Sequence, residues 1–491
     1  MLVCLFESRR QQRSAPVQER HRQHIESAQY FEKRSLKQGS VGWLLLVGLG
    51  VSYTISGDFS GWNYGIAHGG WFGLTVAWFL MGVMYLCTVF GLAELSSALP
   101  TAGGGYGFAR CALGRTAGFA TGLALLVEYV CAPAAVAVFI SNYIGALGVL
   151  PYVPSIAIIV CVYALFAGIH ILGVGEALKL MFAITAIALA ALVAFVAGSL
   201  PAFDASNLLD IPADGSVASS PLLPFGISGL IAGLPFGIWF FLGVEGVPLA
   251  AEEAAQPKRD IPRALIVSLA VLACSGFAVL LLAAGVMGAH AAGVSDTPLI
   301  DALSRAGMAR LATLLNWAGL AGLVASFFSI MYAGSRQMFA LSRAGYLPKC
   351  LALTGRRKTP VAALVAMSLV GIGLVLVLRD GQAILDAAVF GACVSYALMN
   401  LSHMVLRLRA PRMPRAYRTP GGACTTALGF ALSCVAIAST FFVDIGAALG
   451  ALAAVTAGLA YYALHSRRHL VANAPEEEFA QIQAAQSQLR F

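Results

Sequence analysis

Residues 48–65 read GLGVSYTISGDFSGWNYG, and residues 233–253 read GLPFGIWFFLGVEGVPLAAEE. Both stretches are largely apolar, yet each carries an acidic residue and several helix breakers near its middle. Irregular backbone at membrane depth is tolerated only where it is packed in protein or lines a cavity. The two breaks, near Gly57 and Gly243, fall at corresponding places of two five-helix halves. Such paired interruptions indicate a transporter site at the bilayer midplane.

The composition sets the class of protein. The 491 residues are 59% hydrophobic and only 11% charged, with a mean hydropathy of +0.81. A soluble domain carries roughly 25% charged residues, so a soluble enzyme, a disulfide scaffold and a disordered chain are poor fits. The chain is predicted to be an all-α membrane protein with twelve transmembrane helices. The predicted spans are 41–66, 71–97, 117–147, 153–171, 177–199, 226–251, 264–289, 309–340, 360–379, 383–405, 424–443 and 446–465.

We predict one membrane domain, residues 41–465, between two polar tails. Its parts in order are an N-terminal tail over 1–40, a first repeat over about 41–199, a second repeat over about 226–405, two extra helices over about 424–465 and a C-terminal tail over 466–491.

The distribution of charge predicts the orientation. Lys and Arg gather in the N-terminal tail and in alternate loops, whereas the loop at roughly 200–225 has three acids and no base. Positive loops stay on the cytoplasmic side, so both termini are expected in the cytoplasm of a multi-pass protein of the inner membrane. Contact of that face with anionic lipid explains the net charge of +8 without nucleic acid.

Four stretches resemble the amino acid–polyamine–organocation superfamily of permeases. They are ELSSALPTAGGGYGFARCALG (94–114), WFFLGVEGVPLAAEEAAQPKRDIPRA (239–264), SRQMFALSRAGYLPK (335–349) and RAYRTPGG (415–422). Within that superfamily, ISGDFSGWNYG (55–65) together with FFLGVEGVPLAAEE (240–253) is most similar to the bacterial ethanolamine permeases. The resemblance implies the five-plus-five inverted-repeat fold with two C-terminal helices, alternating access, and a site between the broken first and sixth helices.

The candidate substrate-binding residues lie at the two breaks. They are Ser56, Gly57, Asp58, Trp239, Phe241, Gly243 and Glu245. A carboxylate at the bilayer centre costs about 2.5 to 3.5 kcal/mol on insertion scales, so Asp58 needs a partner. It either pairs with a substrate ammonium or caps the outer half of the first helix. In both cases its charge favours a small amine without a carboxylate, such as ethanolamine.

The sixth-helix residues have alternative roles. Trp239 could lie over the ammonium as a cation–π partner or could simply pack, and Phe241 is a weaker candidate for the same wall. Gly243 would allow the unwound turn. Glu245 could bind the amine, carry a proton or make a structural hydrogen bond.

A second set of residues is predicted to act in coupling or gating. Glu128 and Tyr129 lie in the middle of the third span, and Ser326 and Ser329 lie where relatives supply hydroxyls to a sodium-like site. Such hydroxyls also join helices to one another. Some proton-coupled relatives have a lysine deep in the fifth helix, where this chain has Ala188. A coupling proton or sodium ion, exchange and facilitated diffusion all remain open, and no cofactor or metal is predicted.

The sequence therefore predicts a secondary transporter of a small organic amine, with ethanolamine as the best single candidate. An amino acid or polyamine permease of the same superfamily is the alternative, and a non-transporting membrane sensor is a weaker one. An enzyme is not expected, because the His and Cys positions supply no nucleophile–base pair or metal site at membrane depth. The expected partners are the amine and membrane lipid, and the oligomeric state is undetermined.

Overall fold

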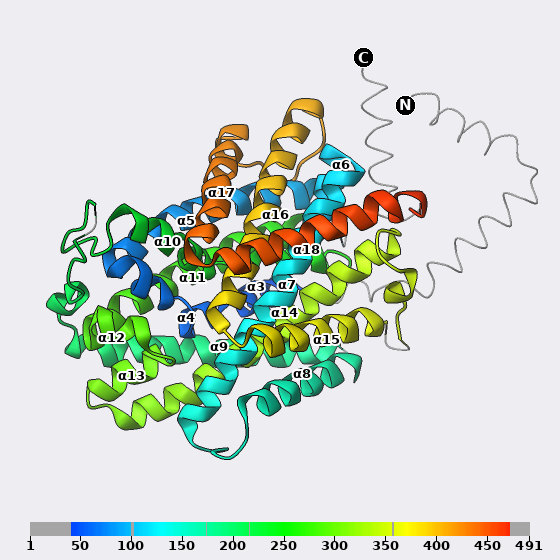
Figure 1. The fold of residues 1–491 in the computed structure, drawn as a ribbon. Helices are drawn as coiled ribbons and strands as arrows, with labels where there is room; N and C mark the ends of the chain where they lie inside the picture. Colours follow the sequence, from blue (N-terminus) through cyan, green and yellow to red (C-terminus); the bar gives the residue numbers. More distant parts are fainter. Residues whose placement is uncertain (1–40, 100–102, 173, 216, 356–357, 472–491) are drawn as a thin grey trace, which may run out of the picture.

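The computed structural model describes residues 41–99, 103–172, 174–215, 217–355 and 358–471. These residues form an assembly of long packed helices, and the expected all-α membrane fold is confirmed (Figure 1). The predicted N-terminal tail, residues 1–40, lies outside the described residues. Residues 472–491 of the predicted C-terminal tail lie outside them as well.

Eleven helical segments within the described residues are long and apolar enough to cross a membrane. They are α5 (Tyr64–Ala98), α7 (Arg115–Leu147), α8 (Ser155–Leu172), α9 (Val174–Ser199), α10 (Gly226–Trp239) with η3 (Val244–Ala250), α11 (Pro257–Met287), α14 (Ala309–Arg343), α15 (Val361–Leu378), α16 (Gly381–Arg409), α17 (Ala423–Val443) and α18 (Ile445–Leu464). The first predicted span is broken into α3 (Trp43–Thr54), α4 (Ser56–Phe59) and the beginning of α5.

Shorter helices lie in the connections between the spans. They are α6 (Gly104–Leu113), η1 (Leu200–Ala202), η2 (Ala205–Leu209), α12 (Ala289–Val294), α13 (Pro298–Arg305), η4 (Lys349–Ala352) and η5 (Ser466–Arg468).

The chain turns between the first and second spans at Gly70, inside α5. Gly70 has φ +72° and ψ 170°, a conformation that glycine adopts without steric cost. A Cβ atom there would also lie 2.6 Å from the Pro224 ring. The C-terminal end of the first predicted span and the whole second span therefore form one kinked element.

The sixth span changes its helical form at Gly243. The α-helix α10 ends at Trp239, Gly243 takes φ +114°, and the chain continues as the 3₁₀ helix η3. The breakers in this stretch thus interrupt a span that would otherwise be a continuous rod. The predicted break is present.

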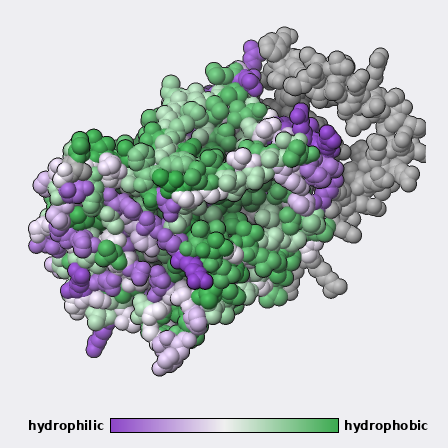
Figure 2. Space-filling view, viewed as in Figure 1, coloured by the Kyte–Doolittle hydropathy of each residue, from purple (hydrophilic) through white to green (hydrophobic). Residues whose placement is uncertain are grey.

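The surface is divided in the way a membrane protein requires. Figure 2 shows mostly hydrophobic side chains across the middle of the visible face, with hydrophilic side chains gathered at the end that carries α12 and α13 and at the opposite end. Exposed Leu and Val side chains on the long helices, such as Val193 and Leu369, would be costly in water but favourable against lipid.

Backbone pairing joins the beginning of the first span to the end of the sixth. The Val41 N–H donates to the Glu253 carbonyl at 2.9 Å, and the Ala255 N–H donates to the Val41 carbonyl at 2.9 Å. The two broken spans are thus held together at the end that the charge distribution predicts to be cytoplasmic.

Candidate functional site

The breaks in the first and sixth spans touch each other. A Cβ atom built on Gly57 would lie only 2.6 Å from the Trp239 carbonyl oxygen and 3.4 Å from the Phe240 Cα. Only a residue without a side chain can therefore occupy position 57 at this approach. The two interrupted segments lie against each other through their backbones.

Asp58 is fully buried and faces α11. Its Oδ2 accepts a hydrogen bond from the Ser275 hydroxyl at 2.6 Å, and its Oδ1 has no hydrogen-bond partner among the described residues. In the following turn, the Gly61 N–H donates to Asn63 Oδ1 at 3.2 Å. Asn63 directly precedes α5, but its side chain makes no cap hydrogen bond to that helix.

Trp239 joins the sixth-span break to the first span. Its indole N–H donates to the Ser60 carbonyl at 3.0 Å, and its ring meets the Phe139 ring edge to face at 6.2 Å. The neighbouring Phe241 ring lies 5.9 Å from the Tyr85 ring. The aromatic residues of the sixth-helix break therefore reach α7 on one side and α5 on the other.

Glu245 lies inside a cluster of tyrosine hydroxyls. Its Oε2 accepts hydrogen bonds from the Tyr85 hydroxyl, from the Tyr396 hydroxyl at 3.1 Å and from the Gly243 N–H at 3.0 Å. The Tyr129 hydroxyl donates to Oε1 at 3.3 Å. Such a set of donors stabilises an ionised carboxylate inside a protein.

Glu128 faces the same cluster but has no such donors. It is fully buried, and neither of its carboxyl oxygens has a hydrogen-bond partner among the described residues. Its carboxyl group lies close enough to that of Glu245 for the two to interact. A pair of adjacent acidic groups is thus buried between α7 and the sixth-helix break, and none of the described residues forms an ion pair with either of them.

The two serines of α14 bind the first span. The Ser326 hydroxyl donates to the Tyr53 carbonyl at 2.7 Å and lies 2.9 Å from the Ser56 hydroxyl, whereas the Ser329 and Ser52 hydroxyls are 2.6 Å apart. The same oxygens that a sodium ion would need are here joined to one another. This is the interhelical arrangement that hydroxyls in membrane helices commonly adopt.

Three residues of the site had no sequence signal. Tyr85 and Tyr396 each stand alone in an apolar span, where a tyrosine is usually a packing residue, and Ser275 is one of two serines in α11. The one hint in the sequence was that each of these residues places a hydroxyl group inside an apolar span with no evident polar partner nearby in the chain. Their partners, Glu245 and Asp58, become apparent only from the packing of the helices.

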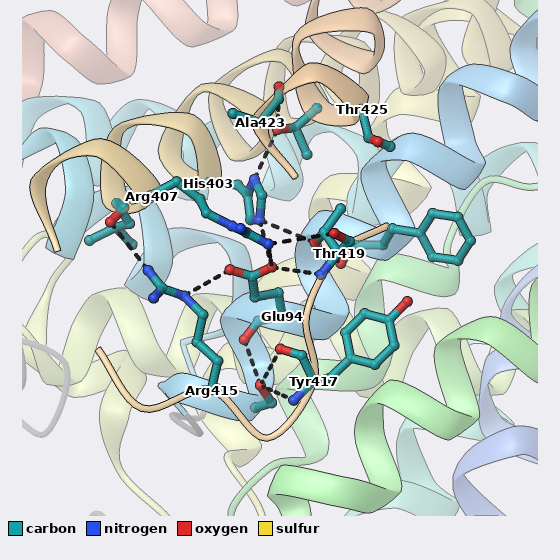
Figure 3. Close-up of polar contacts among 12 residues, drawn as sticks. Glu94, His403, Arg407, Arg415, Tyr417, Thr419, Ala423 and Thr425 are labelled. Carbon is teal, nitrogen blue, oxygen red and sulfur yellow. Dashed lines mark hydrogen bonds and ion pairs between the residues drawn. The ribbon is translucent and has the colours of Figure 1, made fainter. Parts of the chain in front are cut away.

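Two of the sequence motifs, residues 94–114 and residues 415–422, contact each other at Glu94. Figure 3 shows its carboxylate between His403, Arg407 and Arg415. Glu94 Oε2 lies 2.7 Å from an Arg407 nitrogen and 3.2 Å from His403 Nε2, while Oε1 lies 2.8 Å from Arg415 Nε. The Thr419 N–H donates to Oε2 at 2.7 Å. We refer to these five residues as the Glu94 cluster; it binds the loop after α16 to the end of α5.

Two ion pairs join the other two motifs, which cover residues 239–264 and 335–349. An Arg336 nitrogen lies 2.5 Å from Glu253 Oε1, and an Arg343 nitrogen lies 2.9 Å from Glu252 Oε1. The Tyr332 hydroxyl also donates to Glu253. These contacts bind the C-terminal end of the sixth span to α14. The backbone pairing with Val41 lies at the same end of the sixth span.

Comparison with known proteins identifies the family. A model of the family described as "Amino acid permease" matches residues 44–465, which is nearly the whole membrane domain. The chain belongs to this family. It is accordingly a multi-pass membrane transporter.

The individual relatives differ in the solutes for which they are named. An uncharacterized transporter of Rhizobium meliloti is 30% identical, covering 76% of this chain and 80% of its own. A branched-chain amino acid permease of Bacillus subtilis is 25% identical, covering 81% of this chain and 86% of its own. A vacuolar cationic amino acid transporter of Arabidopsis thaliana is 27% identical, covering 69% of this chain and 58% of its own. The family is thus shared by proteins named for different solutes.

Proposed function

We propose that this permease moves a small organic amine, in its cationic form, across the inner membrane by alternating access, with ethanolamine as the first candidate. The observation that carries the proposal is the buried pair Glu128 and Glu245, which meets no described basic side chain in an ion pair. Buried charges are retained only when they are paired. A substrate ammonium would supply the missing positive charge.

The surroundings of the pair suit a compact ammonium group. Tyr85, Tyr129 and Tyr396 present ring and hydroxyl groups around Glu245, and Phe241 adds a ring beside Tyr85. Aromatic faces and carboxylates are the groups that bind ammonium ions in proteins. We propose that Trp239 covers the site from the outer side, next to the first-helix break.

The first-helix break supports an amine that lacks a carboxylate. In amino acid carriers of this superfamily, free backbone N–H groups at the break hold the substrate carboxylate. Here the Ser56 N–H donates to the Ser326 hydroxyl at 3.4 Å, and the Ser60 N–H donates to the Ser56 carbonyl at 3.0 Å. Asp58 adds a further carboxyl group, which would repel a substrate carboxylate in its ionised form.

The alternative is an amino acid permease, which the names of two of the relatives above favour. The deciding measurement is uptake of labelled ethanolamine into proteoliposomes, in competition with ethanolamine, choline, putrescine, alanine, leucine and arginine. We expect ethanolamine to compete best and leucine not to compete. If an amino acid is taken up and ethanolamine neither enters nor competes, the amino acid alternative holds and the amine proposal is wrong.

The same preparation separates transport from sensing. A sensor would bind labelled ethanolamine without accumulating it inside the vesicles, whereas a transporter exchanges internal for external label. We expect rapid exchange, and binding without exchange would contradict transport.

Asp58 is proposed to contribute to this cation preference. Asp58→Asn keeps the shape of the side chain and can still accept the hydrogen bond of Ser275, but it removes the charge. We expect amine uptake to fall sharply in the folded variant. Ser275→Ala, which removes only the described partner, is the matched control and should have the smaller effect. If both variants take up the amine at nearly the wild-type rate, Asp58 does not contribute to substrate binding.

A further inference from the structure

The two acidic groups of the buried pair differ in their hydrogen bonds. Glu245 accepts from three tyrosine hydroxyls and the Gly243 N–H, whereas Glu128 accepts from none of the described groups although it is fully buried. Donors favour the ionised form of the group that accepts them. Glu245 is therefore the member of the pair that is suited to carry the negative charge, and Glu128 is the member suited to hold a proton.

Within the described part of the chain, the elements packed around the pair supply no positive charge to it. Its titratable neighbours are Tyr53 on α3, Tyr85 on α5, Tyr129 on α7, and Cys393 and Tyr396 on α16. All of these groups are neutral or acidic.

The charged or acidic residues that interact with members of this shell are Arg336 and Glu253, through Tyr53, and Asp386, through Cys393. Arg336 and Glu253 form an ion pair with each other at 2.5 Å. The positive charge of Arg336 is thus already balanced by Glu253, and it leaves the Glu128–Glu245 pair without compensation from the described residues.

Two adjacent carboxylates cannot both stay ionised away from water without a cation. Without substrate, one proton shared by the pair removes the repulsion. A substrate ammonium between the two groups would remove it equally well, and it would then need both carboxylates in their ionised form. The proton and the ammonium are therefore alternative occupants of one site.

We propose that the Glu128–Glu245 pair is an exchange site that holds either one proton or the cationic amine, so that this permease exchanges an amine for a proton. This inference rests on the proposed function, since it requires a cationic substrate. The step balances: the amine cation joins a pair made of one carboxylic acid and one carboxylate, and two carboxylates with the bound amine remain while one proton leaves. The proton is released on the side from which the amine came.

The direction of the driving gradient tests the proposal in the wild-type protein. Proteoliposomes are prepared with an acidic interior or an acidic exterior, and initial uptake of labelled ethanolamine is measured, with protein-free liposomes subtracted to remove diffusion of the free base. Exchange predicts that an acidic interior drives accumulation and that an acidic exterior does not. Accumulation driven by an acidic exterior, or uptake indifferent to both gradients, would overturn the exchange mechanism while leaving the amine substrate intact. Absence of amine uptake in every condition would overturn the proposed function itself.

A proton count gives an independent readout. Calorimetric titration of ethanolamine into the purified protein, in two buffers of different ionisation enthalpy, reports the number of protons released per amine bound. We expect about one proton for the wild type near neutral pH, as the stated balance requires. Binding without proton release would contradict the shared site.

The variants locate the proton. Glu128→Gln removes the acid without hydrogen-bond donors, so the number of protons released per amine bound should fall to near zero, and an acidic interior should no longer drive accumulation. Asp386→Asn on α16 is the matched control, because Asp386 is another buried acid with no described hydrogen-bond donor to its carboxyl oxygens. It should keep the wild-type count. An unchanged count in Glu128→Gln would place the proton elsewhere, and the wild-type gradient experiment stands even if a variant fails to fold.

Discussion

The tyrosine hydroxyls around Glu245 show how single residues define this site. Tyr85, Tyr129 and Tyr396 come from three different spans, and each directs its hydroxyl to the same carboxylate. Burying a carboxylate costs free energy, which its hydrogen bonds offset. If one donor is removed, part of that cost is no longer offset, and the folded state is less stable. The cluster therefore contributes to stability as well as to the chemistry of the site.

We expect Tyr85→Phe to lower the free energy of unfolding by about 1.5 to 3 kcal/mol, because it removes a hydrogen bond to a charged group. The measurement is thermal or denaturant unfolding of the purified protein in detergent. Tyr163→Phe is the matched control, since the Tyr163 hydroxyl is buried without a described partner. Its removal should leave stability unchanged or raise it slightly. Equal losses in the two variants would mean that the bond to Glu245 contributes nothing.

Trp239→Ala is expected to raise the half-saturation concentration for the amine. A desolvated cation–π contact is worth about 1 to 2 kcal/mol, which corresponds to roughly 5- to 30-fold in affinity. Concentration-dependent uptake into proteoliposomes gives the value. Trp317→Ala on α14 removes a half-exposed tryptophan from the outer surface of that helix and serves as the control. An unchanged half-saturation concentration in Trp239→Ala would reduce Trp239 to a packing residue.

At the scale of elements, the close approach of the first and sixth spans is the decisive feature. Gly57 lies against the Trp239 carbonyl, and Gly243 provides the positive φ at which the sixth span leaves the α-helix. The sequence places breakers at both points, but the mutual contact requires that the two breaks also lie at the same depth and face each other.

Gly57→Ala tests this contact. The added Cβ atom would lie 2.6 Å from the Trp239 carbonyl oxygen, so the two segments must separate. Overpacking of this kind costs about 1 to 3 kcal/mol, and we expect a large loss of uptake in protein that still elutes as a folded species. Gly450→Ala on α18 is the control, because its Cβ atom meets nothing within 4 Å. Wild-type uptake by Gly57→Ala would show that the approach is not needed for transport.

At the scale of the whole molecule, the four sequence motifs form two contacts at one end of the bundle. The motif around Glu94 binds the motif around Arg415, and the motif that ends the sixth span binds the one that ends α14. Alternating access requires the two ends of a transporter to open in turn. We infer that these ion pairs must rearrange or move as units when the predicted cytoplasmic end opens.

Glu94→Gln should be strongly destabilising, because it leaves the buried Arg415 and the neighbouring Arg407 without their carboxylate. Breaking a buried pair by removing one partner costs about 3 to 5 kcal/mol. Glu252→Gln provides the comparison, since the Glu252 side chain is 20% exposed whereas that of Glu94 is 1% exposed. Because the Glu252 carboxyl group is in partial contact with water, we expect Glu252→Gln to cost less than Glu94→Gln. If both variants lose a similar amount of unfolding free energy, Glu94 is not the more important of the two acidic residues for stability.

The fold class could be predicted from local features of the chain. Long apolar runs predict membrane helices wherever they occur, and the glycines and prolines in the first and sixth spans predict breaks at about the observed positions. Each of these properties depends on residues close together in the chain. For the same reason the candidate residues Asp58, Trp239 and Glu245 could be named before any contact was known.

The partners of those residues depended on tertiary packing. Asp58 meets Ser275, which is 217 positions away, and Glu245 meets Tyr85, which is 160 positions away. Neither tyrosines nor serines in apolar spans carry a signal that distinguishes a binding group from a packing group. Local chemistry therefore decided that the chain crosses the membrane and where its helices break. Which buried acids share a site, and which motif binds which, was decided only when helices distant in the sequence came into contact.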